Sequence, residues 1–203
     1  MSDPLLRLSD VEVHFEKEQS IWDFYQDPDV VHAVDGVSLD IEENDVLALV
    51  GESGCGKTTL GKTAIGLQQP TGGSVEFRGQ DIWEAKAGRG DVPFEEIRQS
   101  LQIIHQDPGS SLNPNQQIVE ILSQPIKLTH PNIGLSERRE RIYSLLERVG
   151  MNPASDFADR YPHQLSGGEK QRDALSRALL LNPDLILADA AIRRLDVPLP
   201  VEI

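Results

Sequence analysis

One stretch of the chain has the residue types and spacing of a phosphate-binding loop, because it matches the pattern G-x-x-x-x-G-K-[ST]. Its glycines let the backbone curl until several N–H groups point at phosphate oxygens. Lys57 is expected to bridge the β- and γ-phosphates of ATP, and the Thr58 hydroxyl to ligate Mg²⁺. The alternative is a glycine-rich turn that binds nothing. The predicted ATP contacts in and just after the loop are Gly51, Glu52, Ser53, Gly54, Cys55, Gly56, Lys57, Thr58 and Thr59.

The segments on either side of the loop decide between these alternatives. The apolar run Val46–Val50 predicts a strand buried on both faces. Residues Lys57–Leu67 predict a helix, whose N-terminus adds positive potential next to a phosphate. A strand, a glycine-rich turn and a helix in this order are the context that a phosphate-binding loop requires. The sequence therefore favours a functional loop.

Three further groups of residues could do related chemistry. A Ser-Gly-Gly sequence opens the predicted helix Gly167–Leu181, where a helix N-terminus makes a second anion site; the alternative is only a capped helix. Asp189 ends the apolar strand Leu185–Ala188, and Gln106 follows the predicted strand Leu101–Ile104. Each of these two residues alone is a weak signal.

Alternating strands and helices indicate an α/β domain with a mostly parallel core sheet. Alternating apolar residues predict two N-terminal strands, at Leu6–Phe15 and Val34–Ile41, with an excursion loop between them. Helices predicted at Gln117–Ser123, Ser136–Val149 and Gly167–Leu181 indicate a helical lobe inserted between the strands Leu101–Ile104 and Leu185–Ala188.

In this order, the motifs resemble those of ABC ATPases, a branch of the P-loop NTPases. Leu165–Arg172 is similar to the LSGGQ-type signature, with Glu169 at the position that is commonly Gln, and Leu185–Asp189 resembles a Walker B strand. The resemblance covers Leu5 to Asp189. Stretches that look like the dipeptide, oligopeptide and nickel importer group are His32–Ser38, Asp107–Pro114 and Tyr161–Gln164.

The resemblance implies a fold, partners and residue roles. The fold would be an incomplete ABC nucleotide-binding domain over residues 1–203, with antiparallel N-terminal strands, a catalytic core at about 1–106 and 183–203, and a helical lobe at about 107–182. Function would require a head-to-tail dimer with a second ATP-binding subunit, permease subunits in the membrane and, indirectly, a solute-binding protein. Phe15 would stack on adenine, or would be a core aromatic. The metal residues would be Thr58, Gln106 and Asp189, and the signature residues acting in trans Ser166, Gly167, Gly168 and Glu169.

The chain departs from the family pattern after Asp189. Ala190 stands where the family has the glutamate that polarises the attacking water, and a methyl group cannot accept a proton. No histidine follows Asp189, so the expected switch histidine is missing. A truncated gene product, a deliberately shortened chain and a degenerate partner subunit would each explain this. We favour truncation, because several residues near the end depart together.

Composition argues against several classes of function. The 203 residues include 19 basic and 33 acidic ones, a formal net charge of −14, which argues against a nucleic-acid-binding surface. No apolar stretch approaches the roughly 20 residues of a membrane-spanning helix. Cys55 is the only cysteine, which excludes an intrachain disulfide and fits a reducing compartment. We expect a cytoplasmic protein held at the inner face of the membrane by permease subunits.

Three functions remain. The first is an ATP-binding subunit of an ABC importer that moves peptides, or nickel or other small solutes. The second is a nucleotide-binding module that binds ATP without turnover, which Ala190 favours. The third is a soluble ABC ATPase of DNA repair or translation, which ranks low because the chain has neither tandem cassettes nor a long coiled-coil insertion.

Overall fold

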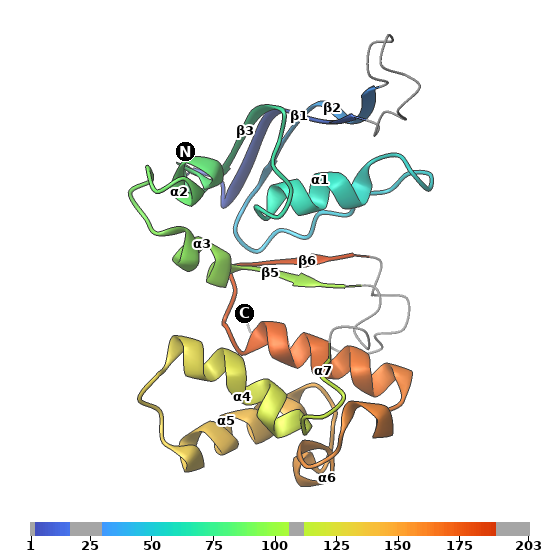
Figure 1. Cartoon of the computed structure of the whole chain (residues 1–203), viewed down its shortest axis with the longest axis vertical. Helices are drawn as coiled ribbons and strands as arrows, with labels where there is room; N and C mark the ends of the chain where they lie inside the picture. Colours follow the sequence, from blue (N-terminus) through green and yellow to red (C-terminus); the bar gives the residue numbers. More distant parts are fainter. Residues whose placement is uncertain (1–2, 17–29, 106–111, 190–203) are drawn as a thin grey trace, which may run out of the picture. The chain divides into compact units, whose positions relative to one another are not determined.

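The computed structural model describes residues 3–16, 30–105 and 112–189, and it divides the chain into two compact units (Figure 1). Unit 1 runs from Met1 to Arg98 and unit 2 from Gln99 to Ile203. Each unit is described by itself below. No helix among the described residues has the length and apolarity to cross a bilayer.

Unit 1 is built on an antiparallel four-stranded sheet in the order β2-β1-β3-β4. Strands β1, β2 and β3 are labelled in Figure 1. The central strand β1 alternates buried and less buried positions over much of its length, which is the period-two pattern of a strand that covers a core with one face. Its buried side chains include Leu6, Leu8, Val11 and Val13. The strands are β1 (Leu6–Glu16), β2 (Val30–Ile41), β3 (Gly72–Phe77) and β4 (Gln80–Asp81).

Two complete helices accompany this sheet. Helix α1 (Lys57–Ala64) contacts β1 and β2 and buries Leu60 and Thr63. Helix α2 (Ile82–Lys86) begins at Asp81, whose carboxylate accepts hydrogen bonds from the N–H groups of the first turn. The boundary between the units falls within α3 (Phe94–Ser100).

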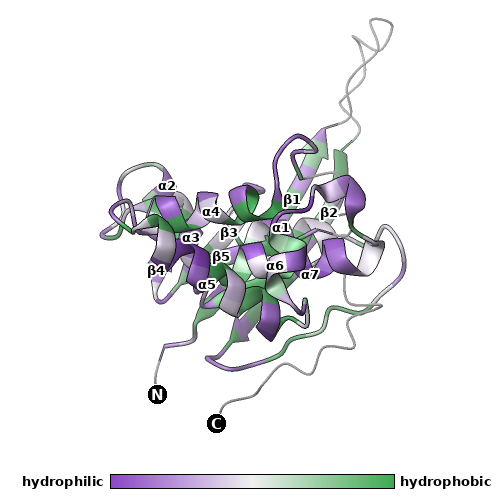
Figure 2. Ribbon diagram, turned by 90° about the horizontal axis from the view of Figure 1, so that it is seen from below, coloured by the Kyte–Doolittle hydropathy of each residue, from purple (hydrophilic) through white to green (hydrophobic). Residues whose placement is uncertain are grey.

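Unit 2 contains a helical bundle around its own apolar core. The core side chains lie on one face of each helix, and Figure 2 shows both hydrophilic and hydrophobic colours along these helices. Fully buried members include Ile118, Leu122, Ile142 and Leu146. The helices are α4 (Ile118–Thr129), α5 (Leu135–Arg148), α6 (Ala154–Ala158), the 3₁₀ turn Pro162–Gln164 and α7 (Gly167–Leu179).

The parallel part of the fold lies in unit 2. Strands β5 (Leu101–Ile104) and β6 (Leu185–Ala188) pair in parallel, with Leu101 opposite Leu185 and Ile104 opposite Ala188. Helix α7 contacts β5, so it packs beside this pair. An α/β fold with antiparallel N-terminal strands is therefore confirmed. The division at 106/107 and 182/183 stays a prediction.

The expectation of a buried strand at Val46–Val50 is wrong for the described structure. These residues form no strand, and Val46 and Val50 are 98% and 93% exposed. A strand needs a neighbour that completes its hydrogen-bond ladder, and neither sheet among the described residues includes this run. An apolar run indicates a preference for burial, but it does not specify the partner.

Candidate nucleotide-binding site

The phosphate-binding loop adopts the left-handed backbone that its glycines permit. Gly54 and Gly56 have φ angles of 86° and 91°. Gly56 is also the residue that precedes α1, and a Cβ atom on it would collide with the carbonyl oxygen of Ala33. Only glycine satisfies both the angle and the close approach of the β2 backbone. The loop is thus held against β2 at its last glycine.

Lys57 is positioned across the loop. Its ammonium group donates hydrogen bonds to the carbonyl oxygens of Gly51, at 2.9 Å, and Glu52, and it lies 3.4 Å from Sγ of Cys55. These carbonyls belong to the beginning of the loop, and Lys57 to its end. The side chain therefore spans the loop, and its charge lies where a phosphate group in the loop would meet it.

The first turn of α1 contributes hydroxyl groups next to this lysine. Thr58 is exposed and Thr59 is half-buried. No acidic residue lies in the first turn, so nothing there neutralises the positive end of the helix dipole. An exposed hydroxyl oxygen is a suitable ligand for Mg²⁺, a hard cation that prefers oxygen.

The predicted signature residues form a capped helix start in unit 2. The Glu169 N–H donates to Oγ of Ser166 at 3.3 Å, and the Ser166 N–H donates to the Glu169 carboxylate at 2.6 Å. This reciprocal pair is a capping box. The hydrogen bond from the Ser166 N–H contributes most to lowering the pKa of Glu169. The positive charges of Arg160 and Arg172 lower this pKa further. The expectation that Ser166 caps α7 is confirmed, and Gly167 and Gly168 are exposed beside it.

Asp189 lies at the C-terminal end of β6, as the sequence predicts. Its N–H donates to the carbonyl oxygen of Ile104 at 3.0 Å, which extends the β5–β6 ladder by one bond. The carboxyl ends of parallel strands are where α/β sheets place ligand-binding groups. Asp189 therefore supplies a carboxylate at the edge where a metal ligand is expected.

Phe15 is 41% exposed on β1, opposite Val31 of β2. Its interpretation as a core aromatic is therefore wrong for the described structure. The exposed ring remains available for stacking on an adenine base, which stays a prediction.

Gln106 and Ala190 lie outside the described residues. The structure describes the phosphate-binding loop and Phe15 in unit 1, and Asp189 and the signature residues in unit 2.

Comparison with known proteins identifies the family. A family model described as "ABC transporter" matches residues 34–193, most of the chain. The chain belongs to the ABC transporter family.

Within this family, the chain is similar to the ATP-binding proteins of peptide transport. The oligopeptide transport protein OppF of Salmonella typhimurium is 40% identical over 98% of this chain. The oligopeptide transport protein AppF of Bacillus subtilis is 40% identical over 99%, and the dipeptide transport protein DppF of Escherichia coli is 36% identical over 100%. The chain spans only 58% to 59% of the length of these relatives.

Solved structures of ABC cassettes match the fold. The ATP-binding cassette MJ0796, in a dimeric post-hydrolysis state bound to ADP and Pi, has a TM-score of 0.76 at 27% identity over 94% of this chain and 76% of that one. The protein cbiO1 of Clostridium perfringens, part of the ABC transporter complex cbiONQ, has a TM-score of 0.70 at 25% identity, covering 92% of this chain and 65% of that one.

The sequence did not predict one residue that contacts the phosphate-binding loop. Ala33 acts through its backbone carbonyl, which limits position 56 to glycine. Any residue at position 33 could make this contact, because the contact uses only the backbone. The amino-acid type at position 33 therefore does not predict the contact, and the glycine at position 56 is its only sign in the sequence.

Proposed function

We propose that the chain is the ATP-binding subunit of an ABC importer that moves peptides. The observation that carries the proposal is the loop Gly51–Thr58, in which Gly54 and Gly56 have a left-handed backbone and Lys57 spans the loop. A loop of this kind can turn its N–H groups toward phosphate oxygens. The similarity to OppF, AppF and DppF favours peptides as the solute over nickel or other small molecules. ATP would bind with its triphosphate in the loop and its adenine near Phe15.

Mg²⁺ would be held by oxygen donors. The exposed Thr58 hydroxyl and the Asp189 carboxylate are the described candidates, and Gln106 is a third. Their chemistry fits the ion, which coordinates oxygen and usually keeps several waters and phosphate oxygens as further ligands. Bound Mg²⁺ would neutralise phosphate charge.

The partners would be a second ATP-binding subunit and a permease in the membrane. Ser166, Gly167 and Gly168 form an exposed, capped helix start. A helix N-terminus attracts an anion, so this one would contact the γ-phosphate held by the loop of the other subunit in a head-to-tail dimer. The ATP-binding cassette MJ0796 is dimeric, which supports a dimer of ATP-binding subunits. The chain would lie on the inner face of the membrane through its permease contact, with a solute-binding protein acting on the other face.

A second candidate is a module that binds ATP without turnover. Ala190 favours it, because loss of a positioned base costs roughly 10²- to 10⁴-fold in rate. Phosphate release by the unmodified chain, compared with Ala190→Glu, separates the two functions. Robust phosphate release by the unmodified chain, well above that of Lys57→Ala and within tenfold of the Ala190→Glu rate, would eliminate the second candidate.

The decisive experiment for ATP binding is an equilibrium titration. Purified chain is titrated with a fluorescent ATP analogue and Mg²⁺, beside Lys57→Ala and the matched control Lys62→Ala, which removes a lysine from the last turn of the same helix. Binding should be lost in Lys57→Ala and kept in Lys62→Ala, with both variants folded by circular dichroism. Equal binding by Lys57→Ala would overturn the proposed site.

The transport function needs a separate test. Coexpression with a candidate permease and solute-binding protein should give peptide uptake that Lys57→Ala reduces. Uptake that is unaffected by Lys57→Ala would exclude the chain as the energy-coupling subunit.

A further inference from the structure

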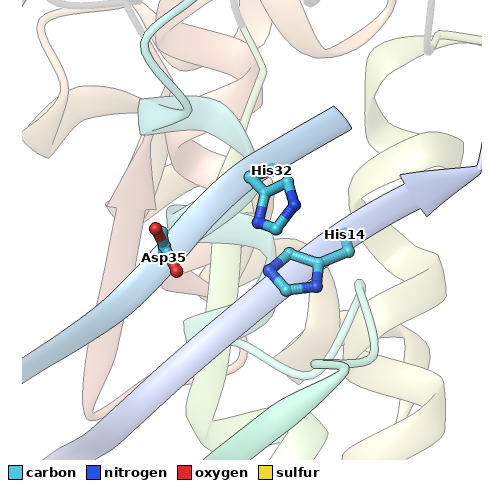
Figure 3. A group of neighbouring side chains, drawn as sticks. All are labelled: His14, His32 and Asp35. Carbon is cyan, nitrogen blue, oxygen red and sulfur yellow. The ribbon is translucent and has the colours of Figure 1, made fainter. Parts of the chain in front are cut away.

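Two histidines and a carboxylate meet on the first hairpin of unit 1. His14 belongs to β1, and His32 and Asp35 belong to β2 (Figure 3). One ligand atom from each lies within 4.8 Å of the others. The imidazole rings of His14 and His32 have centroids 4.0 Å apart and an interplanar angle of 50°. This is the only group of three or more His, Cys, Asp and Glu side chains, among the residues that the structure describes, close enough to share a metal ion.

The strand register explains how these side chains come together. His14 pairs directly with His32, but the next pair is Val13 with Val34, so β2 contains one extra residue, Ala33, opposite a single step of β1. In a regular strand, positions 32 and 35 would point to opposite faces. Two register shifts interrupt the alternation of β2: the bulge at Ala33, and a second one at Asp35 and Gly36, which lie opposite the single residue Glu12. Such bulges re-aim side chains, and here Asp35 lies near both histidines.

The polar atoms of this group are incompletely satisfied. Nε2 of His14 is buried and has no hydrogen-bond partner among the described residues. A buried polar atom without a partner carries a free-energy penalty, which a ligand can remove. His32 and Asp35 are exposed, so a small ion can reach the group and these two side chains can rotate toward it.

The ligand set determines the class of ion. Two imidazole nitrogens and one carboxylate oxygen suit Zn²⁺, which often has three protein ligands and a water in a tetrahedral shell. Mg²⁺ and Ca²⁺ prefer oxygen ligands only, and soft ions prefer thiolates. Ligands about 2.1 Å from a tetrahedral Zn²⁺ lie about 3.4 Å apart, so modest rotations of the two exposed side chains would close the present spacing.

We propose that His14, His32 and Asp35 form a Zn²⁺ site that links β1 to β2, separate from the Mg²⁺ expected at the nucleotide. The ion would bind Nε2 of His14, one imidazole nitrogen of His32 and one carboxylate oxygen of Asp35, with water as the fourth ligand. The proposed ligands come from both strands of the hairpin, and they lie next to Phe15 and at the bulge. The carbonyl oxygen of Ala33, in that bulge, lies against Gly56. Bound Zn²⁺ would therefore stabilise the hairpin against which the phosphate-binding loop packs.

A Co²⁺ titration followed by Zn²⁺ competition tests the site. The tag-free full chain, in a buffer without nucleotide or chelator, should bind one Co²⁺ with the visible absorption of a tetrahedral complex. Zn²⁺ should displace the Co²⁺ stoichiometrically and raise the melting temperature. His32→Ala and Asp35→Ala, both at exposed positions, should each weaken Zn²⁺ binding by at least about 100-fold.

The control is His163→Ala, which removes an exposed histidine of unit 2 and should leave both titrations unchanged. Circular dichroism must show that each variant is folded. Asp35→Asn is a second test, because it replaces the carboxylate with a neutral amide of nearly the same shape. A titration in which the unmodified chain binds no Co²⁺, or in which His32→Ala and Asp35→Ala bind as tightly as the unmodified chain, overturns the proposal. The histidines would then be only a packed cross-strand pair.

Discussion

Asp173 is a buried carboxyl group on α7. The residue has 0% exposure, and neither carboxylate oxygen has a hydrogen-bond partner among the described residues. Burial raises the pKa of Asp173 to about 7, and the charge of Arg177 opposes this only in part. The folded chain therefore holds a proton that the unfolded chain releases at much lower pH.

This carboxyl group should make the chain less stable as the pH rises. An unperturbed Asp has a pKa of 3.8, so between about pH 4 and pH 7 the folded state binds more protons than the unfolded state. Over roughly three pH units, the free energy of unfolding should fall by up to about 4 kcal/mol from this group alone. Urea unfolding at pH 5 and pH 8 should show about 3 kcal/mol of this fall, because roughly two of the three pH units lie above pH 5.

Asp173→Ala should remove that pH dependence and stabilise the chain at pH 8. The matched control is Asp156→Ala on α6, since Asp156 is exposed. The free energy of unfolding could instead depend on pH equally in Asp173→Ala and in the control. That result would mean that Asp173 is already ionised in the folded chain.

Gly56 is the loop residue with the least steric freedom. We expect Gly56→Ala to destabilise the chain by about 1–3 kcal/mol more than Gly54→Ala. Both positions have positive φ, but a Cβ at Gly54 meets no atom within 4 Å, whereas one at Gly56 meets the Ala33 carbonyl. Chemical denaturation compares the two variants, and the difference isolates the backbone contact. Equal losses of stability would show that β2 can move away from the loop.

At the scale of elements, helix α7 begins with a capping box that the sequence predicts. Ser166→Ala should lower the free energy of unfolding by about 1 kcal/mol, because one N–H of the first turn loses its acceptor. The contribution of Glu169 should be complete above its unfolded pKa of 4.5 and be lost as the pH falls through its lowered folded pKa. Urea unfolding at pH 7 and pH 3 measures both effects.

The control for the cap is Ser136→Ala, on the exposed surface of α5. It should change stability little, since Ala is a good helix former and Ser136 is not a cap. If Ser166→Ala were equally neutral, the serine would serve ligand binding rather than the fold.

Elements with a strong local signal were predicted well from the sequence. Strand β6 has the predicted bounds, and α5 and α7 begin within one residue of the predicted positions. The helices α2, α3 and α6 were missed because five to seven residues are too few to establish a helical period. Helix α4 was predicted to end at Ser123 but continues to Thr129 through Pro125.

The sequence also predicts some residues of the candidate sites and not others. The loop and its lysine were predicted because their chemistry requires particular residue types at a fixed spacing. The His14–His32 pair was not predicted, since it depends on strand register and on a bulge, which residue spacing does not reveal. Asp173 was likewise missed, because burial of a charged side chain is set by packing and not by its neighbours in sequence.

At the scale of the whole molecule, charge is the dominant property. Each chain carries a formal net charge of −14, so two copies repel each other as they approach. The proposed head-to-tail dimer must overcome this repulsion with phosphate contacts from loop and signature residues. Its formation should therefore depend on both nucleotide and ionic strength.

We expect the dimer fraction of this chain, with Mg²⁺ and a non-hydrolysable ATP analogue, to rise between 0.1 M and 0.5 M KCl. The Debye length is about 10 Å at 0.1 M salt and about 3 Å at 1 M, so added salt screens the repulsion between like-charged chains. Sedimentation velocity measures the fraction, and Lys57→Ala should remain monomeric at each salt concentration. A dimer that instead dissociates as salt is added would show that complementary charged patches, and not screening of the net charge, control association.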